Sequence, residues 1–221
     1  MKKTTYKLQL LLTILLAFSM KGFAQFSGGA GTAEDPYIIS TKEDLSLFAT
    51  YVNTNAEYGK YINKCYKLAN NIDISGINWD PIEYFSGVFD GDNKVIKGLT
   101  IDANLQYSGL FGRISDATIK NLGVTEIDMK VTCGNFYTYA GGVSGRSGDS
   151  NISNCYTTGL INISVATDFS LSVGGVTGKN NTATVSNCYS SVSINATSTN
   201  HLYAGGVVGD CSTMYSYPCI V

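Results

Sequence analysis

A glycine-rich signature recurs four times between positions 107 and 210 and sets the period of the chain. The copies close at glycines 112, 145, 178 and 209, so they lie 33, 33 and 31 residues apart. Self-similarity with a period of about 20–50 residues is typical of solenoid proteins, in which each repeat packs only against its neighbours. The signature therefore predicts stacked turns, and its copies span Tyr107–Gly112, Tyr139–Gly145, Ser172–Gly178 and Tyr203–Gly209.

Three further positions repeat in phase with the closing glycine. The seventh residue after it is apolar, the ninth is asparagine and the tenth is leucine or cysteine. In a parallel β-helix, equivalent residues of successive turns stack roughly 4.8 Å apart. We expect the apolar columns to face inward and the asparagines to form a ladder at a corner, because asparagine tolerates the left-handed backbone that a corner needs. A substrate site at this ladder is the less favoured alternative. The columns are Ile119, Ile152 and Val185; Asn121, Asn154 and Asn187; and Leu122, Cys155 and Cys188.

One amphipathic helix is predicted before the repeats, at about residues 41–53. Ser40 and Glu43 have the spacing of a capping box, and apolar residues then follow at helical intervals. The helix is expected to cover the first turn of the solenoid, whose apolar end would otherwise meet water. Trp79 is interpreted as a plug of the core or cap rather than a ligand platform. The helical apolar positions are Leu45, Phe48, Ala49 and Val52.

The N-terminus has the features of a secretory signal peptide at residues 1–24. Lys2, Lys3 and Lys7 precede an apolar run at 8–18, and Gly22-Phe23-Ala24 supplies small residues for cleavage. An uncleaved membrane anchor is the less favoured alternative, because the run is shorter than the roughly 20 residues of a spanning helix. No later segment is long and apolar enough to span a bilayer, so we expect no membrane span after cleavage. Removing four lysines and no acid leaves 11 basic against 17 acidic residues, a balance of −6. An acidic surface of this kind repels phosphate backbones and disfavours nucleic-acid binding.

Six cysteines lie in the exported part, at positions 65, 133, 155, 188, 211 and 219. Cys155 and Cys188 are expected to be neighbours on successive turns, at a spacing that a disulfide tolerates. In-phase stacking points both side chains the same way, however, so buried thiols are favoured over a disulfide between them. The sequence does not pair the other cysteines.

Tyrosines and cations also recur near the signature. Tyr107, Tyr139 and Tyr203 precede the glycines, and burial is expected for Tyr139 because it shares strand parity with the inward Val143. Tyr156 and Tyr189 are interpreted as core or corner residues, with an exposed strip that stacks on sugar rings as the alternative. The position after each closing glycine forms a mostly basic outward column, expected to be solvated: Arg113, Arg146, Lys179 and Asp210.

The sequence lacks the residue sets of the commoner catalytic sites. His201 is the only histidine, so the two histidines of an H-E-x-x-H zinc motif are absent, as is a G-x-S-x-G nucleophile elbow near it. The best acidic cluster is Asp90-Gly91-Asp92-Asn93-Lys94, which is interpreted as a turn rather than a calcium or polysaccharide-cleaving site. No residue is therefore assigned a catalytic, cofactor-binding or metal-binding role.

The segment Gly109-Leu110-Phe111-Gly112 and its degenerate copies resemble the GLUG repeat of bacterial secreted and surface proteins. The residues at 31–40 and 85–91 also resemble the N-terminal region common in such proteins. The resemblance covers about residues 26–211 and implies an all-β, right-handed parallel β-helix with adhesin-like roles. GLUG repeats also occur in secreted IgA-cleaving metallopeptidases, but that activity resides in a separate zinc domain.

Three regions are predicted: the signal peptide at 1–24, an N-terminal cap region at 25–84 (strand, helix, strand), and GLUG-type turns at 85–221 that end in mid-turn. Ser216 and Pro218 depart from the repeat pattern there, whereas Cys219 keeps its phase. Because the last turn then presents an unpaired strand edge, end-on association through it is expected.

The expected function is that of a secreted or cell-surface binding or adhesion protein with no catalytic site and no cofactor. Its partner would be an extracellular ligand, either a glycan or a host or matrix protein. The alternatives are a carbohydrate-active enzyme, a polysaccharide lyase or hydrolase, on the same scaffold, and a truncated remnant of a larger surface protein.

Overall fold

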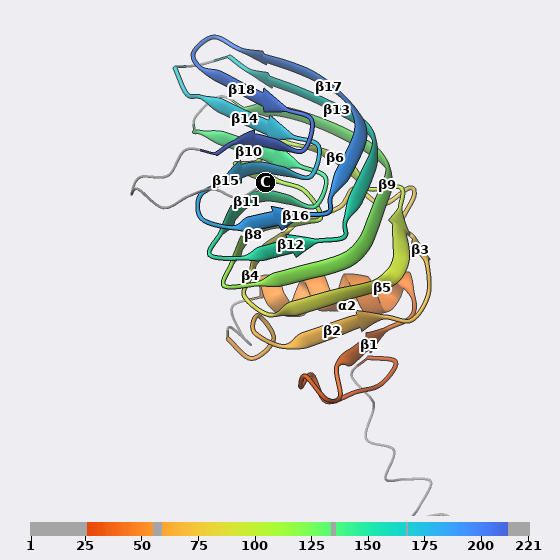
Figure 1. Cartoon of the computed structure of the whole chain (residues 1–221). Coiled ribbons are helices and arrows are strands. Elements are labelled where there is room, and N and C mark those ends of the chain that lie inside the picture. The colour runs from red at the N-terminus through yellow and green to blue at the C-terminus, as the bar shows by residue number, and fades with distance from the viewer. Residues whose placement is uncertain (1–25, 55–58, 134–135, 167, 212–221) are drawn as a thin grey trace, which may run out of the picture.

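The chain folds into a parallel β-solenoid, seen in a computed structural model that describes residues 26–54, 59–133, 136–166 and 168–211 (Figure 1). Equivalent residues of successive turns pair in parallel, and Tyr107, Tyr139, Ser172 and Tyr203 are aligned neighbours on four successive turns. The steps between these positions are 32, 33 and 31 residues, which confirms the period predicted from the glycines. The expected signal peptide at 1–24 and the expected end of the repeats at 212–221 lie outside the described residues.

The described elements alternate short and long strands, with one helix near the start. The N-terminal elements are β1 (Tyr37–Ile39), α2 (Lys42–Asn53), β2 (Cys65–Leu68), β3 (Ile72–Asp73) and β4 (Ile82–Phe85). The next strands are β5 (Val88–Lys97), β6 (Thr100–Ala103), β7 (Tyr107–Ser108), β8 (Phe111–Ser115), β9 (Thr118–Cys133), β10 (Thr138–Gly141), β11 (Ser144–Gly148) and β12 (Asn151–Ser153). The last are β13 (Tyr156–Val165), β14 (Leu171–Gly174), β15 (Thr177–Asn180), β16 (Thr184–Ser186), β17 (Tyr189–Ser198), β18 (Leu202–Gly205) and β19 (Val208–Asp210).

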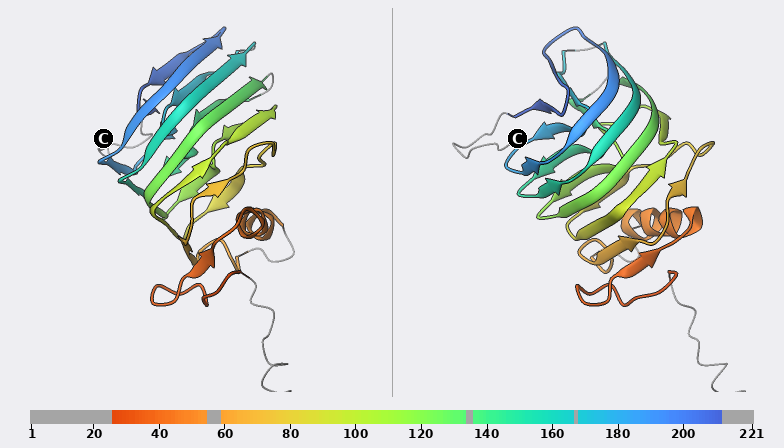
Figure 2. Two further views of the ribbon diagram at one scale, coloured as in Figure 1. Left: turned by 90° about the vertical axis from the view of Figure 1, so that its right-hand side faces the viewer. Right: turned by 45° about the vertical axis from the view of Figure 1, so that its right-hand side comes forward.

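Each full turn contributes to three sheets. A ten-stranded sheet, called here the long sheet, runs along the solenoid through β1, β2, β5, β9, β12 and β16, with β13 and β17 continuing it. The four-stranded sheet has the order β18-β14-β10-β7, and the five-stranded sheet has the order β19-β15-β11-β8-β4. Figure 2 shows the rungs of the long sheet stacked side by side, with α2 at the end of the first turns. Strands β1 to β4 of the N-terminal region belong to these same sheets.

Helix α2 closes the first turn of the core, as predicted. Its buried residues are the four that helical spacing indicated, and the Phe48 ring packs against Tyr66, Phe85, Phe89 and Phe111 at centroid distances of 4.1 to 6.4 Å. The cap lies one residue later than expected. The Thr41 hydroxyl accepts the Asp44 N–H, so Thr41 is the N-cap. The Asp44 carboxylate accepts the Ser40 N–H, one residue before the N-cap, so the two bonds do not form a reciprocal capping box. Thr41 takes this role because its backbone is extended, with φ −133°.

The inward column of isoleucine and valine is confirmed. Ile119, Ile152 and Val185 pair in register and are fully or almost fully buried. Trp79 is buried, and its indole N–H donates to the Leu110 carbonyl at 3.0 Å, which places it in the core. The solenoid interior is therefore a continuous apolar core closed by the helix at its N-terminal end.

The asparagine ladder is confirmed as a structural corner. Asn121, Asn154 and Asn187 all have left-handed backbones, with φ of 53°, 53° and 52°. The Asn154 amide donates to the Asn121 side-chain carbonyl at 3.1 Å, and the Asn121 amide donates to Asp90 at 3.0 Å. Asn121 and Asn154 thus supply both a left-handed backbone and a hydrogen bond to the preceding turn.

Replacing Asn154 separates these two contributions. We expect Asn154→Ala to lower the free energy of unfolding by roughly 1–2 kcal/mol, because alanine disfavours the left-handed backbone and cannot donate the side-chain amide hydrogen bond to Asn121. Asn154→Gly keeps the permitted backbone and should retain more stability. Urea unfolding of both variants checks this order. Equal stability of the alanine and glycine variants would contradict the backbone argument.

The thiols of Cys155 and Cys188 point the same way, as in-phase stacking predicted. Each Sγ lies 3.3 Å from the carbonyl oxygen two residues earlier in its own turn, on Ser153 and Ser186 respectively. Both are free thiols, and so are Cys65 and Cys133. Cys155 is buried, but Cys188 is only half-buried, which corrects the expectation that both lie in the core. The reason is that Cys188 lies between β16 and β17, on the last rung of the long sheet that the structure describes, so no described rung covers its outer side.

This difference predicts the order of thiol reactivity. The neighbouring Cys188 and burial both raise the pKa of Cys155, whereas the contact with Cys155 lowers the pKa of Cys188. Because the thiolate is the reactive form, we expect iodoacetamide to modify Cys188 of the native protein at a lower pH than Cys155. Peptide-level mass spectrometry after labelling from pH 6 to 9 measures both sites. Faster labelling of Cys155 would contradict the packing described.

Candidate functional site

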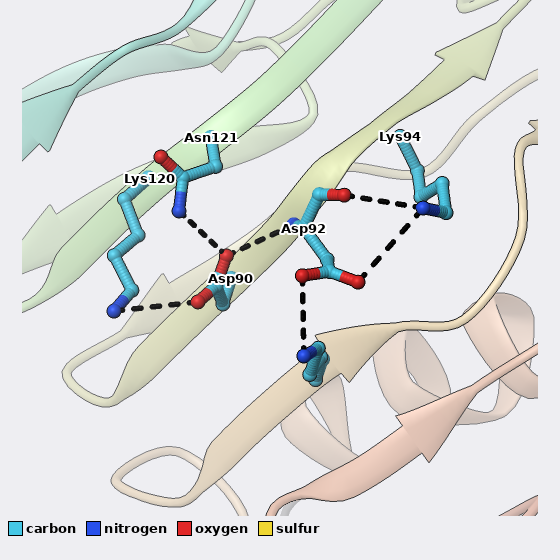
Figure 3. Close-up of polar contacts among 6 residues, drawn as sticks. Asp90, Asp92, Lys94, Lys120 and Asn121 are labelled. Carbon is cyan, nitrogen blue, oxygen red and sulfur yellow. Dashed lines mark hydrogen bonds and ion pairs between the residues drawn. The ribbon is translucent and has the colours of Figure 1, made fainter.

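The acidic segment Asp90–Lys94 forms a bulge in β5 (Figure 3). Asp92 and Asn93 have left-handed backbones, with φ of 48° and 59°, and the Asp90 carboxylate accepts the Asp92 N–H at 2.9 Å. Lys120 pairs with Asp90 at 3.3 Å, while Lys67 and Lys94 pair with Asp92 at 3.1 and 3.8 Å. The segment is therefore an Asx-type turn whose charges are balanced by lysines, as the turn interpretation predicted.

Asp90 also begins the asparagine ladder. Burial opposes its ionisation, but hydrogen bonds from Asn121, the Asp92 N–H and Lys120 outweigh it and hold the pKa of Asp90 below its ordinary value. Within the described residues, no group of three or more potential metal ligands gathers here or elsewhere. The geometry of this segment supports a structural role in the corner of the solenoid.

The glycine signature has a different geometry from the rest of the turn: it folds the chain inward. The Gly-Leu or Gly-Val pairs stack on one another, since Gly142 N–H donates to Gly175 O at 3.0 Å and Gly175 N–H donates to Gly206 O at 3.1 Å. A side chain at Gly142 would meet Ile127 and Thr157 of the long sheet at 2.7 and 2.8 Å. The tip of this turn, called here the inturned corner, therefore packs directly onto the opposite wall of the core.

Glycines on both sides of the tip let the two short sheets lie against each other. A Cβ at Gly145 in β11 would lie 2.7 Å from the Tyr139 carbonyl oxygen and 2.8 Å from the Ser108 nitrogen, both in the four-stranded sheet. A Cβ at Gly178 would lie 2.4 Å from the Ala140 nitrogen. Only glycine permits this backbone-to-backbone approach. Side chains further from the tip then meet across the two sheets.

Tyrosines line the four-stranded sheet at this corner. The rings of Tyr107 and Tyr139 stack at a centroid distance of 5.6 Å and an interplanar angle of 16°. Tyr139 is half-buried and Tyr203 is 42% exposed, with Ser172 between them in register. The expected burial of Tyr139 is therefore wrong. The inturned corner interrupts the strand between Tyr139 and Val143, so parity no longer relates the two side chains.

Cations line the five-stranded sheet and face these rings. The Arg113 guanidinium lies 4.9 Å from the Tyr84 ring centroid and 5.7 Å from that of Tyr107. Lys179 Nζ lies 6.0 Å from the Tyr139 ring centroid and pairs with Asp210 at 2.6 Å. Arg113, Arg146 and Lys179 are adjacent in register on successive turns. The tyrosines of the four-stranded sheet and the cations of the five-stranded sheet are called here the facing columns: Tyr107, Tyr139 and Tyr203, and Arg113, Arg146 and Lys179.

The expectation that the cation column is simply solvated is wrong. Arg113, Arg146 and Lys179 are half-buried, and Asp210 is 7% exposed. The sequence placed them correctly on the outer face, but it did not show that this face folds toward a second sheet. Tyr84 lies outside the sequence repeat, because it precedes the first glycine copy; its register with Arg113 is the signal that identifies it.

A second pair of rings lies on the outer face of the long sheet. Tyr156 and Tyr189 stack at 5.2 Å with an interplanar angle of 5°, and Tyr189 is 60% exposed. The Tyr156 ring covers Gly123, where a Cβ would come within 2.5 Å of it. Tyr156 is half-buried and Tyr189 is exposed, so the pair lies at the surface, which corrects the core or corner interpretation. His201 is also exposed, and its ring lies 6.3 Å from that of Tyr203.

Comparison with known proteins gives partial similarities. No protein-family model matches the chain. A stretch of 106 residues, 45% of this chain, is 32% identical to a protein of Evansella cellulosilytica named "Putative Gly-rich membrane protein". A stretch of 116 residues, 48% of the chain, is 34% identical to Halomucin of Haloquadratum walsbyi. The chain spans only 12% and 1% of the lengths of these two relatives.

Among solved structures, a protein titled "putative immunoglobulin A1 protease" from Bacteroides ovatus aligns with 83% of this chain and 86% of its own. The TM-score is 0.46 and the sequence identity is 16%. Among the described residues, no helix is long and apolar enough to cross a membrane.

Proposed function

We propose that the chain is a secreted or cell-surface binding module of the GLUG-repeat type, with no catalytic site of its own. The facing columns are the single observation that carries this proposal. They combine aromatic rings, which stack on sugar rings or apolar side chains, with cations that are fixed by the scaffold. The signal peptide expected at 1–24 supports export, and the name of the Evansella relative is in keeping with a place at the cell envelope.

The ligand class follows from the composition of the facing columns. Rigid tyrosines lose little conformational entropy on binding, and arginine presents a planar donor set to carboxylate or sulfate groups. A glycan or a matrix protein rich in such groups would satisfy both. Its binding should weaken with added salt, because salt screens the attraction between the cations of the columns and an anionic ligand.

A glycan and matrix-protein array tests the proposal. The expected result is selective binding to a subset of ligands by the folded mature protein, at micromolar concentration and with a signal that falls as salt rises. Circular dichroism of the same sample establishes that the β-fold is intact. Folded protein that binds nothing on the array would overturn the proposal.

The alternative is a carbohydrate-active enzyme that uses the Asp90 and Asp92 carboxylates with their neighbouring lysines. Polysaccharide lyases and hydrolases need acidic groups beside the scissile bond, and lyases also use a basic residue. Both carboxylates here are already paired with lysines, which disfavours this assignment. Incubation with a polysaccharide panel, with and without calcium, decides the matter: release of unsaturated or reducing sugar ends would favour the enzyme.

End-on association is a further part of the proposal. Strand β17 pairs only with β13 among the described strands, so its other edge is open in this part of the chain. Its core-side residues Val192, Ile194 and Ala196 are only half-buried. A second copy of the chain could cover this apolar end by strand pairing. Sedimentation velocity over a concentration series measures self-association, and a monomer at all concentrations would remove this part.

A further inference from the structure

We propose that a pocket at the start of the facing columns binds a sugar ring that carries a carboxylate, such as a hexuronic acid unit. The inference rests on the proposed binding function and names the ligand class for one part of it. The pocket has a volume of about 370 Å³ and lies between the start of the four-stranded sheet and the first strands of the five-stranded sheet. Its lining includes Tyr84, Tyr107, Arg113, Asp80, Glu83 and Gln106.

Arg113 supplies the anion-binding group. Its guanidinium lies between the rings of Tyr84 and Tyr107 and is half-buried. None of the ion pairs formed by the described residues includes it, and its buried Nε has no hydrogen-bond partner among them. A guanidinium matches a carboxylate with two parallel hydrogen bonds. The pocket therefore holds a fixed cation whose natural complement is a carboxylate.

The remaining lining groups favour a sugar over a simple anion. Tyr84 and Tyr107 present aromatic surface beside the guanidinium, and carbohydrate rings pack their C–H faces on such surface. Asp80 and Glu83 are exposed acceptors for hydroxyl groups, and Gln106 offers both a donor and an acceptor. These two carboxylates repel a multiply charged phosphate chain more strongly than a ligand that carries a single carboxylate. A ring with one carboxylate and several hydroxyls satisfies all of these groups together.

The next cation fits the same ligand class. Arg146 is adjacent to Arg113 in register, roughly one strand spacing away, and it is likewise absent from the ion pairs of the described residues. Lys179, one turn further, is neutralised by Asp210. Arg113 and Arg146 are thus neighbouring cations of this column that form no ion pair among the described residues. A second acidic unit of a polymer would reach Arg146 when the first occupies the pocket at Arg113.

The test uses methyl glucuronide, methyl glucoside and glucose 6-sulfate as probes, measured by saturation-transfer NMR and calorimetry on the mature protein. We expect methyl glucuronide to bind at least tenfold more tightly than methyl glucoside, with loss of at least tenfold in affinity in Arg113→Gln. Arg113→Lys keeps the charge but not the planar donor pair, and it should bind at intermediate strength. Lys130→Gln, which removes an exposed cation of the long sheet, is the matched control and should bind as the wild type does.

Three results would overturn the inference. The first is equal binding of the neutral and the acidic glycoside. The second is wild-type affinity in an Arg113→Gln variant whose circular dichroism spectrum and melting temperature show it to be folded. The third is preference for the sulfate ester, which would assign the pocket to sulfated sugars. If the array ligands still bind Arg113→Gln normally, the proposed function stands and only this inference fails.

Discussion

Replacing Phe48 by alanine is expected to lower the free energy of unfolding by about 3–5 kcal/mol, because the ring is fully buried and its removal leaves a cavity. The ring joins α2 to the aromatic side chains of the first turns, from Tyr66 to Phe111. Without it the helix no longer closes the core, and the first rungs lose their cover. Guanidinium unfolding followed by circular dichroism and tyrosine fluorescence measures the loss.

Thr50→Ala in the same helix is the control. Thr50 is exposed and alanine favours the helix, so stability should change by less than about 0.5 kcal/mol. Phe48→Leu keeps an apolar side chain and should lie between the two. A Phe48→Ala variant as stable as Thr50→Ala would show that the helix is not the cap of this core.

Gly145→Ala is expected to cost about 3 kcal/mol, at the upper end of overpacking effects. All three atoms nearest to the new Cβ, at 2.7 to 2.8 Å, belong to backbone: the Gly112 and Tyr139 carbonyl oxygens and the Ser108 nitrogen. Backbone cannot rotate away as a side chain can, so the two short sheets must separate. For a domain of this size the melting temperature should fall by roughly 6–12 °C.

Gly148 lies three residues further along the same strand and gives a matched control. Its Cβ position has no atom within 4 Å, and its backbone is not left-handed. Gly148→Ala should therefore be neutral or slightly stabilising. If the two alanine variants melted at the same temperature, the close approach of the two sheets would be refuted.

Much of the scaffold could be predicted because stacking repeats the same requirement on every turn. The left-handed corner selects asparagine at 121, 154 and 187, and the inward position selects isoleucine or valine. Helix α2 could be predicted because a core end must be covered and its buried face has helical spacing. These features depend on the local backbone conformation and on the burial of side chains, and both can be predicted from the sequence of a single segment.

The inturned corner could not be predicted in the same way. The glycines indicated a corner, but glycine is equally compatible with an ordinary turn. The approach of one short sheet to the other depends on contacts between residues of neighbouring turns, which a single segment does not contain. Strand parity therefore failed at Tyr139, and the cations at 113 and 179 were expected to be solvated. The pairing of Tyr84 with Arg113 depends on register between strands 29 residues apart, since 113 − 84 = 29.

The central claim is that ligands bind at the facing columns rather than at the exposed rings of the long sheet. The two tyrosine pairs allow a direct comparison, because both are stacked and lie on successive turns. The deciding measurement is the affinity of the best array ligand for Tyr107→Ala/Tyr139→Ala and for Tyr156→Ala/Tyr189→Ala, each verified as folded. We predict a loss of at least tenfold in the first variant and wild-type affinity in the second. The reverse order, or equal affinities, would contradict the account.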